Sequence, residues 1–170
     1  MTDGAVVWFT GLPASGKSTL AARLAARLRD ARCPAVLLDG DEVRDALAPR
    51  PGHDDAGREA LYGSLAGLAA LIAEQGTVAI VAATAHRRAW REHARTLAPR
   101  FVEVHVATPL AECQRRDPKQ LYAAGLAALP GVGVPYEAPD RPEVVAPRGD
   151  DPRVVDAVLA ALAERGVAIG

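Results

Sequence analysis

Hydrophobic residues along the chain occur in two patterns, as short continuous runs and as longer stretches with helical spacing. The runs predict strands at residues 5–10, 35–38, 77–83, 101–106 and 144–146. The helical spacing predicts helices at residues 19–29, 55–74, 88–97, 109–116 and 152–165. Strands that alternate with helices are typical of a parallel sheet with crossover helices. The pattern therefore predicts a single α/β domain over residues 1–170, with a mostly parallel five-stranded sheet and helices on both faces.

Residues at the ends of two predicted helices support their boundaries. Asp151 is placed to cap the last helix, Pro152 to occupy its first position and Gly166 to end it. Thr108 stands where it would cap the preceding helix. The last helix is expected to close one face of the sheet.

Two segments outside these patterns, residues 48–57 and 129–147, are rich in proline and glycine. Such composition is typical of mobile loops. In open α/β sheets, the loops at the carboxyl ends of the strands surround the ligand. We therefore expect both segments to border a binding site.

The turn between the first strand and the first helix carries the strongest functional signal. Residues 11–18, GLPASGKS, match the phosphate-binding pattern G-x-x-x-x-G-K-[ST] at every fixed position. Its glycines let backbone N–H groups approach a phosphate, and the helix N-terminus adds partial positive charge. Lys17 would neutralise the β- and γ-phosphates, and the Ser18 hydroxyl would bind Mg²⁺. A plain turn is the alternative. The residues expected to contact the nucleotide are Gly11, Leu12, Pro13, Ala14, Ser15, Gly16, Lys17, Ser18 and Thr19.

Two carboxylates follow the second strand, in the segment DGDEVR at residues 39–44. Many phosphate-loop proteins place an acid at the end of the third strand to assist Mg²⁺, but that strand reads TVAIVAAT here. Asp39 or Asp41 could therefore contact Mg²⁺ through water while the other accepts the proton of an attacking hydroxyl. The alternative is structural, with Asp39 in a turn and Asp41 capping a helix at residues 42–48. The expected catalytic residues are Lys17, Asp39 and Asp41.

Composition and charge narrow the choice of partner. Hydrophobic residues make up 49% of the 170 residues, and the formal net charge is −1 with both signs interspersed. This pattern favours a small-molecule partner over nucleic acid or a membrane surface. Cys33 and Cys113 lack the spacing of a metal site or a disulfide framework. A strand at residue 5 leaves no room for a signal peptide, so we expect a cytoplasmic protein with free thiols.

Four blocks occur in order along residues 6–146: GLPASGKST, LDGDEVR, FVEVHVATPLAECQRRDPKQLY and PYEAPDRPEVV. Together they resemble the adenylylsulfate kinase family, whose members transfer the γ-phosphate of MgATP to the 3′-hydroxyl of adenylyl sulfate. The resemblance implies a phosphate-loop kinase fold, ATP and Mg²⁺ as cofactors, and a homodimer. It also implies that Asp39, Asp41 and Arg44 face the acceptor.

The resemblance further implies a lid over residues 115–135 that closes on the nucleotide and excludes water. Arg115, Arg116 and Lys119 would belong to this lid and contact ATP. An arginine there can stack on adenine and reach a phosphate, because guanidinium offers a flat face and a fork of donors. For the two arginines, a solvated helix end is the alternative.

The chain departs from the family pattern on the acceptor side. Arg58 takes the place of a conserved arginine, but the ENIRR that usually follows reads EALYG, so an amide and two basic side chains are missing. The usual ISPYR reads TAHRR, and Ala85 replaces a serine that some members phosphorylate, which excludes that intermediate. The usual NFTG reads ALPG, so Leu129 replaces an aromatic platform for the acceptor's adenine. The expected substrate contacts are Asp41, Arg44, Arg58 and Leu129.

The histidines give weaker signals than these blocks. His86, with Arg87 and Arg88, would either bind an anion near the acceptor or be solvated. His53 carries no signal beyond its place in a loop.

The sequence leaves three alternatives for the acceptor and the activity. Adenylyl sulfate is the first expectation, with a KM above that of an intact site. A kinase of another small alcohol, such as a nucleoside or specialised metabolite, is the second. A weakly active nucleotide-binding switch is the third, and the paired carboxylates argue against it.

Overall fold

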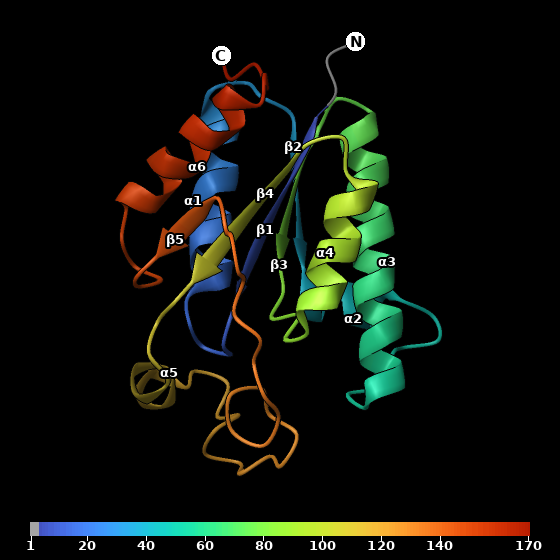
Figure 1. Cartoon of the computed structure of the whole chain (residues 1–170), viewed down its shortest axis with the longest axis vertical. Helices are drawn as coiled ribbons and strands as arrows, with labels where there is room; N and C mark the ends of the chain where they lie inside the picture. The colour runs from blue at the N-terminus through green and yellow to red at the C-terminus, as the bar shows by residue number, and fades with distance from the viewer. Residues whose placement is uncertain (1–3) are drawn as a thin grey trace.

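The computed structural model describes residues 4–170, which form a parallel sheet with helices on both faces (Figure 1). The strands are β1 (Ala5–Gly11), β2 (Ala35–Asp39), β3 (Val78–Ala82), β4 (Phe101–Val106) and β5 (Val144–Ala146). The helices are α1 (Lys17–Asp30), α2 (Gly40–Ala46), α3 (Asp55–Glu74), α4 (Arg88–Leu97), α5 (Leu110–Arg116) and α6 (Arg153–Glu164). The strand order is β2-β3-β1-β4-β5, and all neighbouring strands are parallel. The predicted α/β fold with a five-stranded sheet is confirmed.

Helices cover both faces of the sheet, which explains why its central strands read as continuous apolar runs. Alternate residues of β1 point to opposite sides. Val7 and Phe9 pack in one core with α1 and α6, whereas Val6 and Trp8 pack in a second core with α3 and α4. Figure 1 shows these two layers on either side of the strands.

The carboxyl ends of the strands share one edge of the sheet, because every pair is parallel. In the register of the sheet, Phe9 of β1 and Asp39 of β2 both lie level with Ala82 of β3. The phosphate-loop pattern that follows β1 and the DGD segment that follows β2 therefore emerge at the same edge. In Figure 1, α5 and the long connections that follow it lie beyond this edge.

The cap of α2 differs from the predicted one. The helix begins at Gly40, and its cap is Asp39, whose Oδ1 accepts a hydrogen bond from Asp41 N (2.9 Å). The prediction of Asp41 as the cap of a helix at residues 42–48 is therefore wrong. The physical reason is that β2 passes into α2 without an intervening turn, so the last strand residue becomes the cap.

Two further helix starts also differ. The Thr108 hydroxyl makes no cap to α5 and instead donates to Ser15 O (2.7 Å). The last helix begins at Arg153, one residue after Pro152, although Asp151 does accept the Arg153 N–H (3.0 Å) as a cap would.

The two predicted loops contain regular structure. The first ends early because α3 begins at Asp55. The second includes β5 and an isolated bridge between Pro130 and Val134. Across residues 4–170, no helix combines the length and the apolar character that crossing a membrane requires.

Candidate active site

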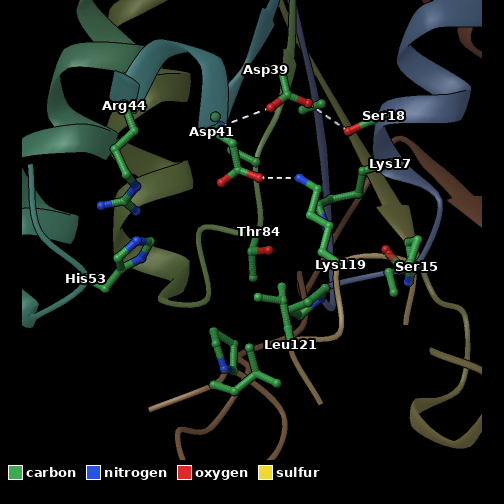
Figure 2. A pocket seen from close by; sticks show the side chains of 18 of the residues that line it. Ser15, Lys17, Ser18, Asp39, Asp41, Arg44, His53, Thr84, Lys119 and Leu121 are labelled. Atoms are coloured by element: carbon green, nitrogen blue, oxygen red, sulfur yellow. Dashed lines mark hydrogen bonds and ion pairs between the residues drawn. The ribbon is translucent and has the colours of Figure 1, made fainter. Parts of the chain in front are cut away.

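A cavity of about 820 Å³ opens at the carboxyl edge of the sheet, a size typical of small-molecule sites. Its wall includes residues from the first three of the four blocks that the sequence singled out, and none from PYEAPDRPEVV. The predicted site residues that line it are residues 13–19, Asp39, Asp41, Arg44, Arg58, Arg116, Lys119 and Leu129, whereas Gly11, Leu12 and Arg115 do not. Figure 2 shows Lys17 and Ser18 on one side of the cavity and Arg44 with His53 on the other. The site thus has two walls, one built by the phosphate-loop pattern and one by α2, α3, their connection and residues 126–130.

Close backbone packing holds the phosphate-loop segment in shape. Gly16 has a φ of 103°, and a Cβ on it would lie 2.5 Å from the Cα of Gly149, so only glycine fits here. Behind the loop, the Thr108 hydroxyl donates to Ser15 O (2.7 Å) and accepts from Gly149 N (3.1 Å). Sequence reasoning missed both Thr108 and Gly149 as parts of the site, because they come from distant segments and carry no local motif.

Lys17 lies within this loop and reaches back across it. Its Nζ donates to the carbonyls of Gly11 (3.1 Å) and Leu12 (2.8 Å). Burial lowers the pKa of Lys17 to about 8, although the charges of Asp41 and Asp39 act in the opposite direction. An ammonium in such surroundings gains from an added anion, because the anion offsets the lost hydration.

Ser18 and Asp39 bring two oxygen ligands together. The Ser18 hydroxyl donates to Asp39 Oδ2 (2.7 Å). Hydroxyl and carboxylate oxygens are the ligands that Mg²⁺ prefers, and it commonly takes only one or two groups from the protein. Residues 4–170 hold no cluster of three or more His, Cys, Asp or Glu side chains suited to a metal. The Ser18 and Asp39 pair therefore suits Mg²⁺ that shares its shell with phosphate and water, rather than a metal held by the protein alone.

Asp41 lies between the two walls, where it pairs with Lys119 (Figure 2). Burial opposes the charge of Asp41, but the hydrogen bond and charge of Lys119, with Arg44 and Lys17, outweigh burial and lower its pKa. The same pairing raises the pKa of Lys119. Asp41 is therefore ionised at neutral pH and can accept a proton.

Two buried arginines form the basic part of the second wall. Arg44 and Arg58 are 5% and 8% exposed. Nη1 of Arg44 donates to Pro51 O (3.1 Å) and to Gly52 O. Nη2 of Arg58 donates to Ala128 O (2.7 Å). Each guanidinium thus holds a loop at the rim of the cavity and keeps further N–H donors for an anion.

The rest of this wall includes Leu61 and Tyr62 of α3 together with Leu129. Tyr62 stands where the family pattern ENIRR has its first arginine, Leu61 stands where that pattern has isoleucine, and Leu129 replaces an aromatic ring. His53 also lines it and lies beside Arg44 (Figure 2). Burial and the charge of Arg44 lower the pKa of His53. Sequence reasoning missed His53, because one histidine in a loop has no spacing that reports its neighbours.

The segment predicted as a lid, residues 115–135, packs against the phosphate-loop segment. The Tyr122 hydroxyl donates to Pro13 O (2.8 Å). A Cβ on Gly131 would meet the Leu12 side chain at 2.5 Å. The lid and the loop are therefore in direct contact in this structure.

The three basic residues predicted for the lid lie differently. Arg116 and Lys119 line the cavity. Arg115 instead directs its guanidinium to Glu112 (2.6 Å), and its side chain is 72% exposed. Contact between Arg115 and a nucleotide stays a prediction.

His86 was expected either to bind an anion or to be solvated; the expectation of solvation is wrong, and anion binding stays a prediction. It is 1% exposed and lies outside the cavity wall, with its ring edge-on to Trp90 at a centroid distance of 5.0 Å. Within the part of the chain that the structure describes, its ring nitrogens have no hydrogen-bond partner. Arg87 pairs with Asp55 (2.8 Å).

Comparison with known proteins tests the family resemblance that the motifs indicated. The family described as adenylylsulphate kinase matches residues 3–147. The chain belongs to this family. An adenylyl-sulfate kinase of Synechococcus is 37% identical over 169 residues, which cover 96% of this chain and 97% of that protein. The resemblance seen in the sequence is confirmed, and with it the class of enzyme, a kinase.

Two other relatives of this adenylylsulfate kinase family member differ in how much of their own length this chain covers. The bifunctional enzyme NodQ of Azospirillum brasilense is 47% identical over 146 residues, 82% of this chain but 24% of that protein. The APS kinase CysC of Mycobacterium tuberculosis, solved in complex with AMPPNP and APS, has a TM-score of 0.88 at 32% identity, covering 96% of this chain and 99% of that one. The chain therefore spans nearly all of the solved CysC chain and about a quarter of NodQ.

Proposed function

We propose that this member of the family transfers the γ-phosphoryl group of MgATP to the 3′-hydroxyl of adenylyl sulfate. One observation carries the proposal: the phosphate-loop segment and the buried Arg44 lie on opposite sides of Asp41 in a single cavity (Figure 2), which the buried Arg58 also lines. The CysC complex, which holds a nucleotide analogue together with APS in the same fold, supports this division into a nucleotide side and an acceptor side.

On the nucleotide side, residues 11–19 would surround the phosphates of ATP. Lys17 would turn from the Gly11 and Leu12 carbonyls to the β- and γ-phosphates, where its charge counts most. Ser18 and Asp39 would hold Mg²⁺, which neutralises phosphate charge when it is bound. Arg116 and Lys119 would contact ATP from the lid, which excludes water from the cavity.

On the acceptor side, Arg44 and Arg58 would bind the phosphosulfate group, because each keeps free N–H donors at the cavity wall. Asp41 would accept the proton of the attacking hydroxyl. Its position between the walls suits this role, and its lowered pKa keeps the carboxylate ionised in the free enzyme. Lys119 would have to leave Asp41 as the substrates enter, since a paired carboxylate is a weaker base.

A kinase of another small alcohol is the second candidate, and two changes on the acceptor wall favour it. Tyr62 lines the cavity where the family pattern supplies a basic side chain, and Leu129 lines it where the pattern supplies an aromatic ring. A base loses roughly 1 to 3 kcal/mol of stacking when its aromatic partner is missing. The proposed acceptor should therefore bind less tightly than in a family member with an intact platform.

The oligomeric state and the compartment are proposed on weaker grounds. We infer a homodimer from the resemblance to the family. A cytoplasmic location is inferred from composition, since Cys33 and Cys113 are free thiols in the structure.

The experiment that tests the function measures ADP release by purified protein with MgATP and one acceptor at a time. The acceptors are adenylyl sulfate, AMP, adenosine and a panel of small alcohols, with Lys17→Ala protein as the control for contaminating ATPase. Adenylyl sulfate should give the fastest release and a 3′-phosphorylated product. If adenylyl sulfate is not consumed and gives no protection against heat, while MgATP does protect, another alcohol is the acceptor.

A further inference from the structure

Behind the cavity, a buried arginine links three segments of the chain. Arg91 of α4 is 0% exposed, and all three nitrogens of its guanidinium are engaged. Nε donates to Oε1 of Glu103 (2.8 Å), which lies on β4 and is itself 2% exposed. Nη1 donates to the carbonyl of Ala85, and Nη2 donates to the carbonyl of Glu137 (2.5 Å). The arginine therefore ties two loops to the sheet.

The first of these loops forms part of the cavity wall. Ala85 follows Thr84, which lines the cavity (Figure 2). Ala85 has a φ of 40°, in the left-handed region that residues with a Cβ rarely adopt. Such a conformation persists only where the surroundings hold it. The bond from Arg91 to the Ala85 carbonyl is a contact of this kind.

The second loop begins where the lid ends. Glu137 follows Tyr136, whose hydroxyl is hydrogen-bonded to Thr10 Oγ1 (2.9 Å), and Thr10 directly precedes the phosphate-loop segment. The two loops also bond to each other, because Glu137 N donates to His86 O (2.8 Å). The phosphate-loop strand, the cavity turn and the end of the lid thus meet around the guanidinium of Arg91.

This geometry calls for an arginine. Its planar fork sends N–H groups in fixed directions to separate acceptors, whereas a lysine offers one compact ammonium. The carboxylate of Glu103 balances the charge and sets the plane of the guanidinium. A buried ion pair is weak evidence for stability, since apolar residues of similar volume often serve as well. We therefore expect the Arg91 and Glu103 pair to position the two loops that carry Ala85 and Glu137.

The geometry points to Arg91 as a positioning residue that fixes the Thr84 turn and the end of the lid against the phosphate-loop strand, and so sets where the acceptor hydroxyl sits. Arg91 lies outside the cavity wall and acts through these two loops. The inference rests on the proposed function, because transfer to the acceptor is one of its readouts. A misplacement of about 1 Å in a reacting group can cost on the order of 100-fold in rate.

The test removes the donors without leaving a buried charge. In an Arg91→Met/Glu103→Met variant, two apolar residues replace both ions, which should preserve the fold. We expect kcat/KM for the acceptor to fall about tenfold or more, while Kd for MgATP changes less than about twofold. Hydrogen exchange at the amides of Arg88 and Glu137, which bond across the two loops, should accelerate about tenfold, while α1 is unchanged.

Two further variants serve as controls. Arg95 lies on the same helix, and its hydrogen bonds go to the carboxylates of Glu103 (3.2 Å) and Glu143 (2.6 Å). Arg95→Met should therefore lower Tm without changing kcat/KM for the acceptor or the two exchange rates. Arg91→Lys keeps a charge near Glu103 but loses the fork, so it should show the acceptor defect even if the double variant does not fold.

The outcomes separate this inference from the proposed function. If Arg91→Lys and the double variant keep wild-type kcat/KM for the acceptor and wild-type exchange, Arg91 is only structural and the inference is wrong. An equal acceptor defect in Arg95→Met would also overturn it. If the wild type does not phosphorylate adenylyl sulfate, the proposed function fails, and exchange at Arg88 and Glu137 still decides whether Arg91 holds the loops.

Discussion

The two walls of the cavity are built in different ways. The nucleotide wall comes largely from one continuous segment, residues 13–19, which belongs to a motif that the chain fits at every fixed position. The acceptor wall is assembled from α2, α3 and the lid, which contribute Arg44, Arg58 and Leu129. A contiguous loop carries its chemistry in its own backbone, whereas the second wall depends on how separate elements pack. The departures of this chain from the family pattern leave the phosphate-loop motif intact, and Tyr62 and Leu129 are two of them that line the acceptor wall.

The walls also differ in how they hold positive charge. Lys17 has a pKa lowered by burial and donates to carbonyls of its own loop. Arg44 and Arg58 are buried but stay charged, and they hold loops at the rim. Substitutions on one wall should therefore change the binding constant of one substrate and leave that of the other substrate unchanged. The largest effect is expected at Lys17.

Lys17→Ala should abolish turnover and leave the fold intact. Electrostatic stabilisation of this kind is worth about 3 kcal/mol or more, so kcat should fall by at least roughly 100-fold. Steady-state ADP release and thermal melting measure the two effects. Arg23→Ala, an exposed change on the same helix, is the matched control and should leave kcat unchanged. Near wild-type transfer by Lys17→Ala protein would end the phosphate-loop interpretation.

Asp41→Asn should lower kcat by about 100-fold and leave ATP affinity nearly unchanged, because a proton acceptor acts in the transition state. Single-turnover kinetics separates the chemical step from binding. Asp45→Asn, on the same helix but on the surface, is the matched control. If Asp41→Asn keeps full kcat and only lowers Tm, the carboxylate is structural and a nucleotide-binding switch gains support.

Raising the pH should weaken MgATP binding through Lys17. The folded-state pKa of about 8 lies below the ordinary 10.5, so the unfolded chain holds this proton more tightly between these values. Stability of the ligand-free protein from this group therefore rises as pH increases from about 8 to 10.5. Bound phosphates favour the ammonium, so binding at pH 9 should take up close to one proton and be roughly tenfold weaker than at pH 7.5.

Calorimetry in buffers of different ionisation enthalpy measures this uptake. The comparison protein is Lys17→Ala, in which the uptake and the extra loss of affinity should both disappear. Uptake that persists in the variant would assign the proton to another group on the nucleotide wall.

The difference between the walls also explains what could be predicted from the sequence. The phosphate-loop segment and the α/β class with a mostly parallel five-stranded sheet follow from local patterns, and the structure confirms this fold. Thr108, Gly149 and His53 could not be found, because their roles depend on contacts with segments distant in the chain. The cap of α2 was placed on Asp41 rather than Asp39 because apolar runs do not show where a strand passes directly into a helix.

Leu129→Phe should improve binding of the acceptor and leave binding of ATP unchanged. Leu129 is 7% exposed and lines the cavity, so a larger ring here can extend toward the acceptor's base. The expected gain is about 1 kcal/mol, which corresponds to a roughly fivefold lower KM for adenylyl sulfate with no change in KM for ATP. Initial rates with each substrate varied in turn measure both constants.

The matched control places the same ring elsewhere on the lid. Leu126 also lines the cavity but is 48% exposed, so a phenylalanine there should stay in solvent and leave both KM values unchanged. If Leu126→Phe improves adenylyl sulfate as much as Leu129→Phe, the gain comes from a more apolar lid and not from a platform. If Leu129→Phe raises the KM of adenylyl sulfate, the ring takes space that the acceptor needs, and the interpretation of this position as a missing platform is wrong.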